Sequence, residues 1–563
     1  MSRRSKITIV VLAIVLMVVV AGVFFAGRLP SNAVLVLHIR GTIEDQKPSG
    51  IFGELGMPGA LVQYQLLDAL EAAKTDARIR GLVLNIESVG AGWARTQELR
   101  RKLLEFRESG KPSVCFLNMD AASNQAYYLA TGCEQVWSVP TAPLAILGMM
   151  TESLFFRGTL DKLGIYPDLY HIAEYKTAQN QFVEKKYTPA HREMSESLVR
   201  SIYEQYLQEV AQARGMTAAE FRALVEQGPH LSGAALEKKL VDRTAYWDEV
   251  REYFEEKVGT WEPVELKQYV KQLPDDGQYT VAVVHATGLI VVGDSDYDPF
   301  MGWVMGSNSV ARDLRQACDD AAVRAVVFRV DSGGGSAVAS EIIRREVAQC
   351  REKGKPVVVS MSDVAGSGGY WISMSADKIV AEPTTLTASI GVVYGKMNIS
   401  GLFRLLGLST DFVALSENAT LLYEQQNFTP QQRQIIERLM RDIYDNFLAG
   451  VAQGRKMDVA AVERIAKGRV WTGAQARDLG LVDELGGYDR AFALARELAS
   501  LPADARLRVV RYPRLKTLFQ ALLEGPAVLE QLTARADLAS RMRRILQVTE
   551  GVQAQMPLSI RIR

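Results

Sequence analysis

The chain has 563 residues, of which 48% are hydrophobic and 23% are charged, and its 65 basic residues balance 65 acidic ones. This composition is typical of a folded protein, and the length predicts two or more domains. The balanced charge gives no support to nucleic-acid binding. Four cysteines without a C-x-x-C spacing and five scattered histidines exclude a zinc ribbon, a thioredoxin-type pair and a histidine-rich metal site.

The first predicted element is a membrane anchor over residues 7–27. Three basic residues lie within the first six positions, and the twenty residues 7–26 carry no charge. A helix of that length spans about 30 Å, the thickness of a bilayer core. The Phe-Phe-Ala-Gly that ends the run makes a poor cleavage site, which favours a retained anchor over a cleaved signal peptide. The basic flank predicts a cytoplasmic tail, with the bulk of the chain on the periplasmic or other extracytoplasmic side of the inner (plasma) membrane.

The region after the anchor is repeated once. Residues 79–88 match residues 323–332, and matched segments keep offsets between 240 and 247 over more than two hundred residues. Each copy alternates strand-like runs with helical stretches, including one long helix in each copy, over residues 189–214 and 430–455. This alternation predicts right-handed βαβ crossovers and a mainly parallel sheet in each copy. The expected fold class is therefore α/β with a tandem duplication.

A glycine cluster distinguishes the second copy from the first. After a predicted strand, the second copy reads Ser332-Gly-Gly-Gly-Ser336, whereas the first copy reads Ser88-Val-Gly-Ala-Gly92. Bare backbone N–H groups between a strand and a helix can face a ligand. A nucleotide phosphate loop is disfavoured, because the Lys-Ser/Thr that completes such a loop is missing.

A second difference concerns a serine between glycines. The second copy reads Val364-Ala-Gly-Ser-Gly-Gly-Tyr-Trp371, which places Ser367 opposite Asn124 of the first copy. A serine in this setting can be a nucleophile whose neighbouring N–H groups hold an oxyanion. The motif taken alone is explained equally well by a tight turn.

The base that would activate this serine is better sought among the lysines than among the histidines. His38 and His285 occupy matched positions inside predicted strands, and the other three histidines occur only in the first copy. Lys176, in Glu-Tyr-Lys-Thr-Ala, has Ala419 as its counterpart in the second copy. The first copy thus keeps a lysine and lacks the serine, and the second copy does the reverse. A buried lysine with a lowered pKa can serve as the base, so we pair Lys176 with Ser367.

In combination, the A-G-S-G-G-Y-W, T-A-S-I-G-V and E-Y-K-T-A motifs resemble those of the long, duplicated bacterial signal peptide peptidases (the protease IV type), from the anchor to about residue 500. The resemblance implies two crotonase/Clp-like βαβ domains and a Ser/Lys dyad that needs no metal or cofactor. It makes Ser367 the nucleophile, Lys176 the general base and Ser389 a residue that orients the lysine. It also makes the N–H groups of Gly335 and Gly368 the oxyanion donors.

One departure from the family pattern lies in the glycine cluster. Gly333 stands where the family usually has proline, which loosens the loop before the oxyanion donor. The resemblance further implies cleaved signal peptides and other apolar peptides as substrates, contact with the lipid bilayer through the N-terminal helix, and a homotetramer. Two alternatives stay open: a non-catalytic membrane scaffold and a crotonase-like acyl-CoA hydratase or isomerase. The set of Ser367, Lys176 and Ser389 argues against the first, and Ser367 with the anchor against the second.

The predicted organisation has five parts: a cytoplasmic tail (1–6), an anchor (7–27), a first repeat that supplies the lysine (33–272), a second repeat that supplies the serine (278–500), and a helical basic extension (501–563). The extension carries eleven basic and five acidic residues. It could approach lipid headgroups, although a solvated helical face explains the pattern better. For the cysteines we expect buried free thiols, although an extracytoplasmic location would permit a bridge.

Overall fold

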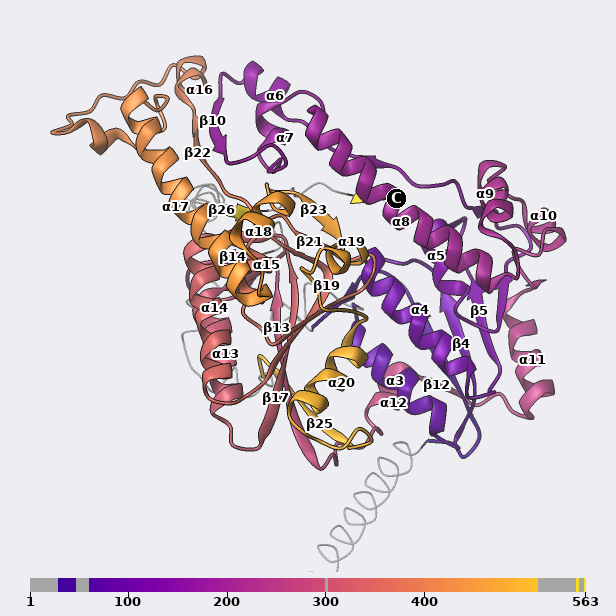
Figure 1. Ribbon diagram of the computed structural model, residues 1–563. Coiled ribbons are helices and arrows are strands. Elements are labelled where there is room, and N and C mark those ends of the chain that lie inside the picture. Colours follow the sequence, from indigo (N-terminus) through magenta and orange to yellow (C-terminus); the bar gives the residue numbers. More distant parts are fainter. Residues whose placement is uncertain (1–28, 47–59, 299–301, 515–552, 556–560, 563) are drawn as a thin grey trace, which may run out of the picture.

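The computed structural model describes residues 29–46, 60–298, 302–514, 553–555 and 561–562 (Figure 1). The predicted cytoplasmic tail and membrane anchor, residues 1–6 and 7–27, lie outside these ranges. Among the helices that are described, none has both the length and the hydropathy of a membrane span.

Two parallel sheets, one from each repeat, form the body of the protein. The first sheet has the order β11-β7-β5-β4-β1-β12, and the second contains the order β24-β20-β19-β17-β13-β25. The strands of the first are β1 (Ala33–Ile39), β4 (Ile79–Ile86), β5 (Ser113–Leu117), β7 (Gln135–Ser138), β11 (Arg243–Thr244) and β12 (Pro263–Glu265). Those of the second are β13 (Tyr279–Thr287), β17 (Val323–Ser332), β19 (Val357–Gly366), β20 (Lys378–Ala381), β24 (Glu484–Leu485) and β25 (Leu507–Tyr512). Because the two orders correspond strand by strand, the predicted α/β duplication is confirmed.

The two repeats share one hydrophobic core. Alternate residues of β1 face opposite sides of its sheet: Leu35 and Leu37 belong to the shared core, whereas Val34 lies in a smaller cluster on the other face. The shared core also contains Val281 and Val283 of β13 in the second repeat. Helices α3 (Gln63–Thr75), α4 (Trp93–Arg107) and α20 (Tyr488–Leu498) lie between the sheets (Figure 1). Strands covered on both faces become continuous apolar runs, as the sequence shows.

The two long helices begin where the sequence predicts. Helix α8 (Pro189–Ala213) follows Thr188, and α17 (Pro430–Arg455) follows Thr429. Each threonine hydroxyl accepts a hydrogen bond from the backbone N–H three residues later, at 3.3 and 3.2 Å. Proline at the first helical position completes the same start signal in both copies.

A strand pair ties the repeats together above the sheets. Strand β10 (Tyr166–His171) of the first repeat pairs antiparallel with β22 (Val393–Asn398) of the second repeat. The pairing runs over the whole length of both strands, and they lie side by side in Figure 1. This pairing places the segment that leads from β10 to Lys176 against the second repeat.

The C-terminal extension is not helical where the structure describes it. Leu507–Tyr512 forms β25, which pairs in parallel with β13, so the predicted helix over 501–563 is wrong at these residues. Adjacent valines followed by tyrosine favour a strand, and β13 offers an open edge. Gln553–Gln555 and Arg561–Ile562 are also strands, β26 and β27.

The expectation of free thiols is wrong as well. Cys115 is bonded to Cys133, and Cys318 is bonded to Cys350, with Cα–Cα distances of 5.6 and 5.5 Å. The second bond joins α13 (Ser307–Asp319) to α14 (Ala337–Glu352), which pack side by side. Each bond stays within one repeat. Folding brought together cysteines 18 and 32 positions apart, which the sequence spacing alone did not pair.

Candidate active site

Ser367 lies between the end of β19 and the start of α15 (Gly368–Ser373). Its backbone has φ 54° and ψ −114°, a conformation that side chains with a Cβ rarely adopt. The serine N–H donates a 2.6 Å hydrogen bond to the carbonyl of Ala388, which holds this conformation in place. Strained backbone of this kind concentrates at functional sites.

Strand pairing places a second serine beside the first. Strand β21 (Leu386–Ala388) runs parallel to β19, with Ala388 opposite Gly366. The residues that follow the two strands, Ser367 and Ser389, therefore emerge next to each other. Ser389 also has a positive φ, 54°, and its N–H donates to the carbonyl of Arg469 at 2.8 Å.

The lysine reaches this point from the other repeat. After β10, the Ile172 N–H donates to Val392 at 3.1 Å, and the Tyr175 N–H donates to Lys467 at 3.1 Å. The turn then passes Gly468, where a Cβ would lie 2.5 Å from the backbone of Lys176. Because only a glycine allows that approach, Gly468 of the second repeat permits the close packing of Lys176 from the first repeat.

The three predicted side chains meet in a closed site. Lys176 Nζ lies 2.6 Å from Ser367 Oγ, 3.1 Å from Ser389 Oγ and 2.8 Å from the Ser389 carbonyl oxygen. All three residues are 0% exposed. Burial lowers the pKa of Lys176 well below its usual 10.5. A lysine in this state can be neutral near physiological pH and accept a proton from a hydroxyl.

The two glycines predicted as oxyanion donors lie on neighbouring segments. Gly335 belongs to β18 (Gly334–Ser336) and has φ 152°; a Cβ there would come within 2.1 Å of the Ile290 carbonyl. A Cβ on Gly368 would lie 3.1 Å from the Gly335 nitrogen. Both positions thus require glycine, and their backbones are in contact beside Ser367.

The described residues around Ser367 contain no hydrogen-bonded histidine and no cluster of metal-binding side chains. In the described part of the chain, no histidine hydrogen-bonds Ser367, and His285 is buried, with a pKa lowered to about 3 mainly by burial. The same residues contain no group of three His, Cys, Asp or Glu side chains that could hold a metal ion.

Residues 105–260 and 349–502 both match the model of peptidase family S49, so the match is itself duplicated. The chain belongs to peptidase family S49. This S49 serine peptidase is 31% identical to the chloroplastic serine protease SPPA of Arabidopsis thaliana over 94% of its own length and 78% of the relative's. It is 33% identical to Protease 4 of Salmonella typhi over 84% and 79% of the two chains. A putative signal peptide peptidase SppA of Enterococcus faecium is 32% identical over 41% of this peptidase and 66% of the relative.

The S49 site has a support that the motifs did not reveal. Asp363, four residues before Ser367, enters the N-terminus of α4 in the first repeat. Its carboxylate accepts hydrogen bonds of 2.9 Å from the N–H groups of Gly92 and Arg95, and from the Arg95 guanidinium. This helix start is the counterpart of the predicted oxyanion segment, Ser332–Ser336, in the second repeat. The first repeat thus uses its own copy of the segment to hold the strand that leads to Ser367.

Asp331 completes this support from the neighbouring strand. It lies 3.5 Å from the Arg95 guanidinium and accepts a 3.0 Å hydrogen bond from the Val364 N–H. Burial raises the pKa of Asp331 to about 7, and Arg95 acts in the opposite direction. In the sequence, the two aspartates directly precede the glycine cluster and the serine motif. This matched placement of two aspartates was the feature of the sequence that could have indicated a shared supporting role.

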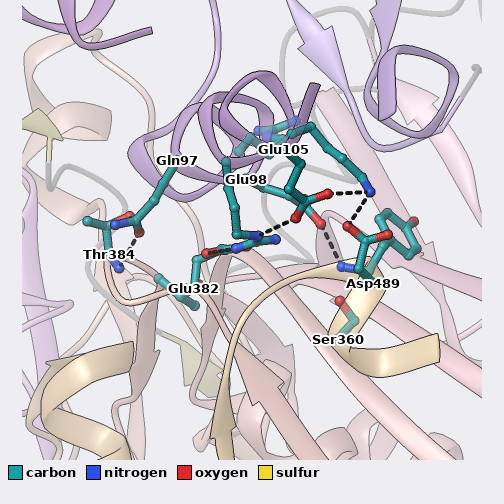
Figure 2. A network of polar contacts seen from close by, with 12 residues as sticks. Gln97, Glu98, Glu105, Ser360, Glu382, Thr384 and Asp489 are labelled. Carbon is teal, nitrogen blue, oxygen red and sulfur yellow. Dashed lines mark hydrogen bonds and ion pairs between the residues drawn. The ribbon is translucent and has the colours of Figure 1, made fainter. Parts of the chain in front are cut away.

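Further along α4, buried polar contacts fix the two repeats relative to each other (Figure 2). Gln97 accepts hydrogen bonds from the N–H and hydroxyl of Thr384, at 3.1 and 2.9 Å. Glu98 accepts from the Arg329 guanidinium at 3.0 Å and from the Tyr488 N–H at 2.6 Å. Glu98 and Arg329 are each 1% exposed. Removing one partner of a buried ion pair typically costs about 3–5 kcal/mol of stability. These contacts therefore stabilise one relative position of the two repeats.

Proposed function

We propose that this S49 peptidase is a membrane-anchored endopeptidase that hydrolyses apolar peptides, namely the signal peptides left after preprotein cleavage, with a Ser367/Lys176 dyad. The observation that carries the proposal is the 2.6 Å approach of Lys176 Nζ to Ser367 Oγ inside a fully buried site. A buried lysine that stays charged is usually paired with a carboxylate, as Lys102 is with Glu71 and Glu105. Here the partners of the amine are two serines.

The proposed reaction begins with neutral Lys176. It takes the proton of Ser367 as Oγ bonds to the peptide carbonyl carbon, and the carbonyl oxygen becomes an oxyanion. The N–H groups of Gly335 and Gly368 stabilise this oxyanion, and such a donor typically contributes about 2.7–4 kcal/mol. The lysine then gives its proton to the leaving amine as the peptide C–N bond breaks.

Hydrolysis of the acyl-enzyme repeats the same proton path. Lys176 takes a proton from water as the water oxygen attacks the ester carbon, and returns it to Ser367 Oγ as the ester bond breaks. Ser389 holds the amine between these steps, because its hydroxyl and carbonyl oxygens lie 3.1 and 2.8 Å from Nζ. Every proton is accounted for by the chain, the peptide and water.

Two features support the proposed location. The disulfides Cys115–Cys133 and Cys318–Cys350 are favoured in an oxidising compartment, outside the cytoplasm. The charge pattern around residues 7–27 predicts an anchor with the same orientation. A periplasmic-active reporter fused after Arg563 should therefore function, and activity of a cytoplasmic reporter at that position would contradict the orientation.

The proposed homotetramer rests on the family resemblance and on one exposed arm. Between β22 and α17, apolar side chains project to solvent, and Val413 and Leu415 are 94% and 99% exposed. A subunit contact would cover this arm. Sedimentation of the detergent-solubilised full chain tests the assembly.

Hydrolysis itself is tested with the full chain in detergent and fluorogenic apolar peptides. We expect hydrolysis by the native chain and covalent labelling of Ser367 by a fluorophosphonate. If the chain hydrolyses no member of a broad peptide set, the proposal is contradicted and a scaffold role is favoured, whether or not the fluorophosphonate labels Ser367.

A further inference from the structure

Ser332 lies at the end of β17, shortly before the proposed oxyanion donor Gly335. Its hydroxyl donates a 2.6 Å hydrogen bond to the Gly288 carbonyl and accepts one of 3.1 Å from the Gly334 N–H. Ser332 is only 2% exposed. One buried hydroxyl therefore joins the start of the glycine cluster to the turn between β13 and β14 (Leu289–Val291).

This turn leads to the residue that pairs with Gly335. Ile290 of β14 pairs in parallel with Gly335, and a Cβ on Gly335 would lie 2.1 Å from the Ile290 carbonyl oxygen. The Gly288 N–H donates a 2.9 Å hydrogen bond to the Asp331 carbonyl. The turn and the glycine cluster are thus bonded to each other at both ends, and the Ser332 hydroxyl supplies one of the bonds at the first end.

Three consecutive glycines need such a constraint. Residues 333–335 have no side chain that could pack and hold their peptide groups, and a glycine backbone adopts many conformations. Strand pairing with β14 and β26 determines where β18 lies. The hydrogen bond from the Gly334 N–H to Ser332 fixes how the residue before Gly335 is turned, and hence the direction of the Gly335 N–H.

The same contact occurs in the first repeat with the opposite hydrogen-bond direction. Ser88, the counterpart of Ser332, accepts a 2.8 Å hydrogen bond from the N–H of Gly41, the counterpart of Gly288. The first repeat has Asn124 in place of the nucleophile, so its serine joins the same two segments without serving a reaction. Ser88 therefore provides a matched control.

We propose that Ser332 is a positioning residue for the reaction: its hydroxyl sets the direction of the Gly335 N–H, so that this N–H meets the oxyanion. The inference rests on the proposed function, because it takes Gly335 as an oxyanion donor. Removing a donor outright typically lowers kcat by about 10²–10³-fold. Ser332→Ala keeps the donor but frees its orientation, so we expect kcat/KM for apolar peptides to fall by about 10–10²-fold.

The test compares two probes that differ only at the reacting carbon, fluorescein-Leu-Leu-leucinal and fluorescein-Leu-Leu-leucinol. The aldehyde carbon bonds to Ser367 Oγ and its oxygen then lies where the oxyanion forms, whereas the alcohol cannot react. Both dissociation constants are measured by fluorescence polarisation on the detergent-solubilised full chain. In Ser332→Ala, affinity for the aldehyde should fall by about 10–10²-fold, and affinity for the alcohol should change by less than about twofold.

The ratio of the two affinities separates positioning from loss of folding. Both probes are measured on the same preparation, so a smaller folded fraction weakens both equally and leaves their ratio unchanged. Ser88→Ala should keep the native ratio even where its unfolding temperature falls. A native ratio in Ser332→Ala would overturn the inference, whatever the stability of that variant.

The pH profile distinguishes an effect on the oxyanion from an effect on the dyad. The described hydrogen-bond partners of Lys176 Nζ are Ser367 and Ser389, not Ser332. Ser332→Ala should therefore lower kcat/KM at every pH without moving the ionisation of the lysine. A shifted ionisation would show that the serine acts through the lysine and would overturn the proposal.

The native chain decides between the two proposals. If it binds the aldehyde more tightly than the alcohol and Ser332→Ala keeps that preference, only the role of Ser332 is contradicted. Equal affinity of the native chain for both probes would overturn the role of Ser332, and absence of peptide hydrolysis as well would contradict the proposed function.

Discussion

Replacing Lys176 with methionine removes the proposed base while keeping an unbranched side chain of similar length. The structure predicts opposite effects on activity and stability. A general base typically contributes about 10²–10⁴-fold to the rate, so kcat/KM should fall by that factor. Lys176→Arg should do no better, because an arginine stays charged and cannot accept the proton.

The effect on stability follows from the lowered pKa of Lys176. In the unfolded chain a lysine has a pKa of about 10.4, so between the lowered value and about 10.4 the unfolded state binds more protons. The free energy of unfolding therefore rises with pH across this window, and the lysine destabilises the fold at neutral pH. Each unit of lowering corresponds to about 1.4 kcal/mol. Lys176→Met should be at least as stable as the native chain and should lose this pH dependence.

The assay combines kcat/KM from about pH 5 to about pH 10, a range that ends just below the ordinary lysine pKa of about 10.4, with thermal unfolding of the same preparations. Native activity should rise with pH along one ionisation, as neutral Lys176 forms. Lys467→Met is the matched control: Lys467 is 44% exposed and pairs with Glu174, and its backbone carbonyl, which holds Tyr175, is retained. An active Lys176→Arg chain would refute the dyad, and a destabilised Lys176→Met chain would refute the burial argument.

Three further predictions concern Ser367, the contacts of Arg95 and the disulfides. Ser367→Ala should abolish hydrolysis and fluorophosphonate labelling with an unfolding temperature near the native one; retained turnover would exclude this nucleophile. Arg95→Met leaves two largely buried aspartates, 14% and 11% exposed, without their cation, so stability should fall by up to about 3 kcal/mol and kcat by up to about 10²-fold. Adding Asp363→Asn should restore part of both, and an unaltered kcat in Arg95→Met would rule out a positioning role. Reduction of the disulfides should lower the free energy of unfolding by about 3–4 kcal/mol for each loop, measured by denaturation with and without reductant. A Cys115→Ala, Cys133→Ala chain should show only the remaining half of this shift, and insensitivity to reductant would contradict the pairing.

The duplicated α/β fold could be predicted because short segments of the sequence indicate its strands and helices. Apolar runs such as residues 325–330 predict buried strands, and Thr-Pro before each long helix predicts its first turn. The meeting of Lys176 with Ser367 was also predictable, because each repeat had lost what the other retained. That comparison needs only the alignment of the two halves.

The remaining features depend on pairings between distant segments. No local pattern in residues 166–171 indicates that β22, more than two hundred positions later, is their partner. The burial of Asp363 in the N-terminus of α4 likewise arises only when the repeats pack. The cysteines were misjudged for the same reason, since a bond requires a short Cα–Cα distance that sequence spacing does not specify.

The pairing of β10 with β22 has a consequence for the nascent chain during synthesis. During synthesis the lysine leaves the ribosome first, and it has no serine to activate until residue 367 has emerged and the second repeat has folded around it. The proposed dyad therefore cannot assemble in a truncated or half-folded chain. A peptidase whose reactive pair needs both repeats cannot cleave itself or nearby proteins before the second repeat has folded.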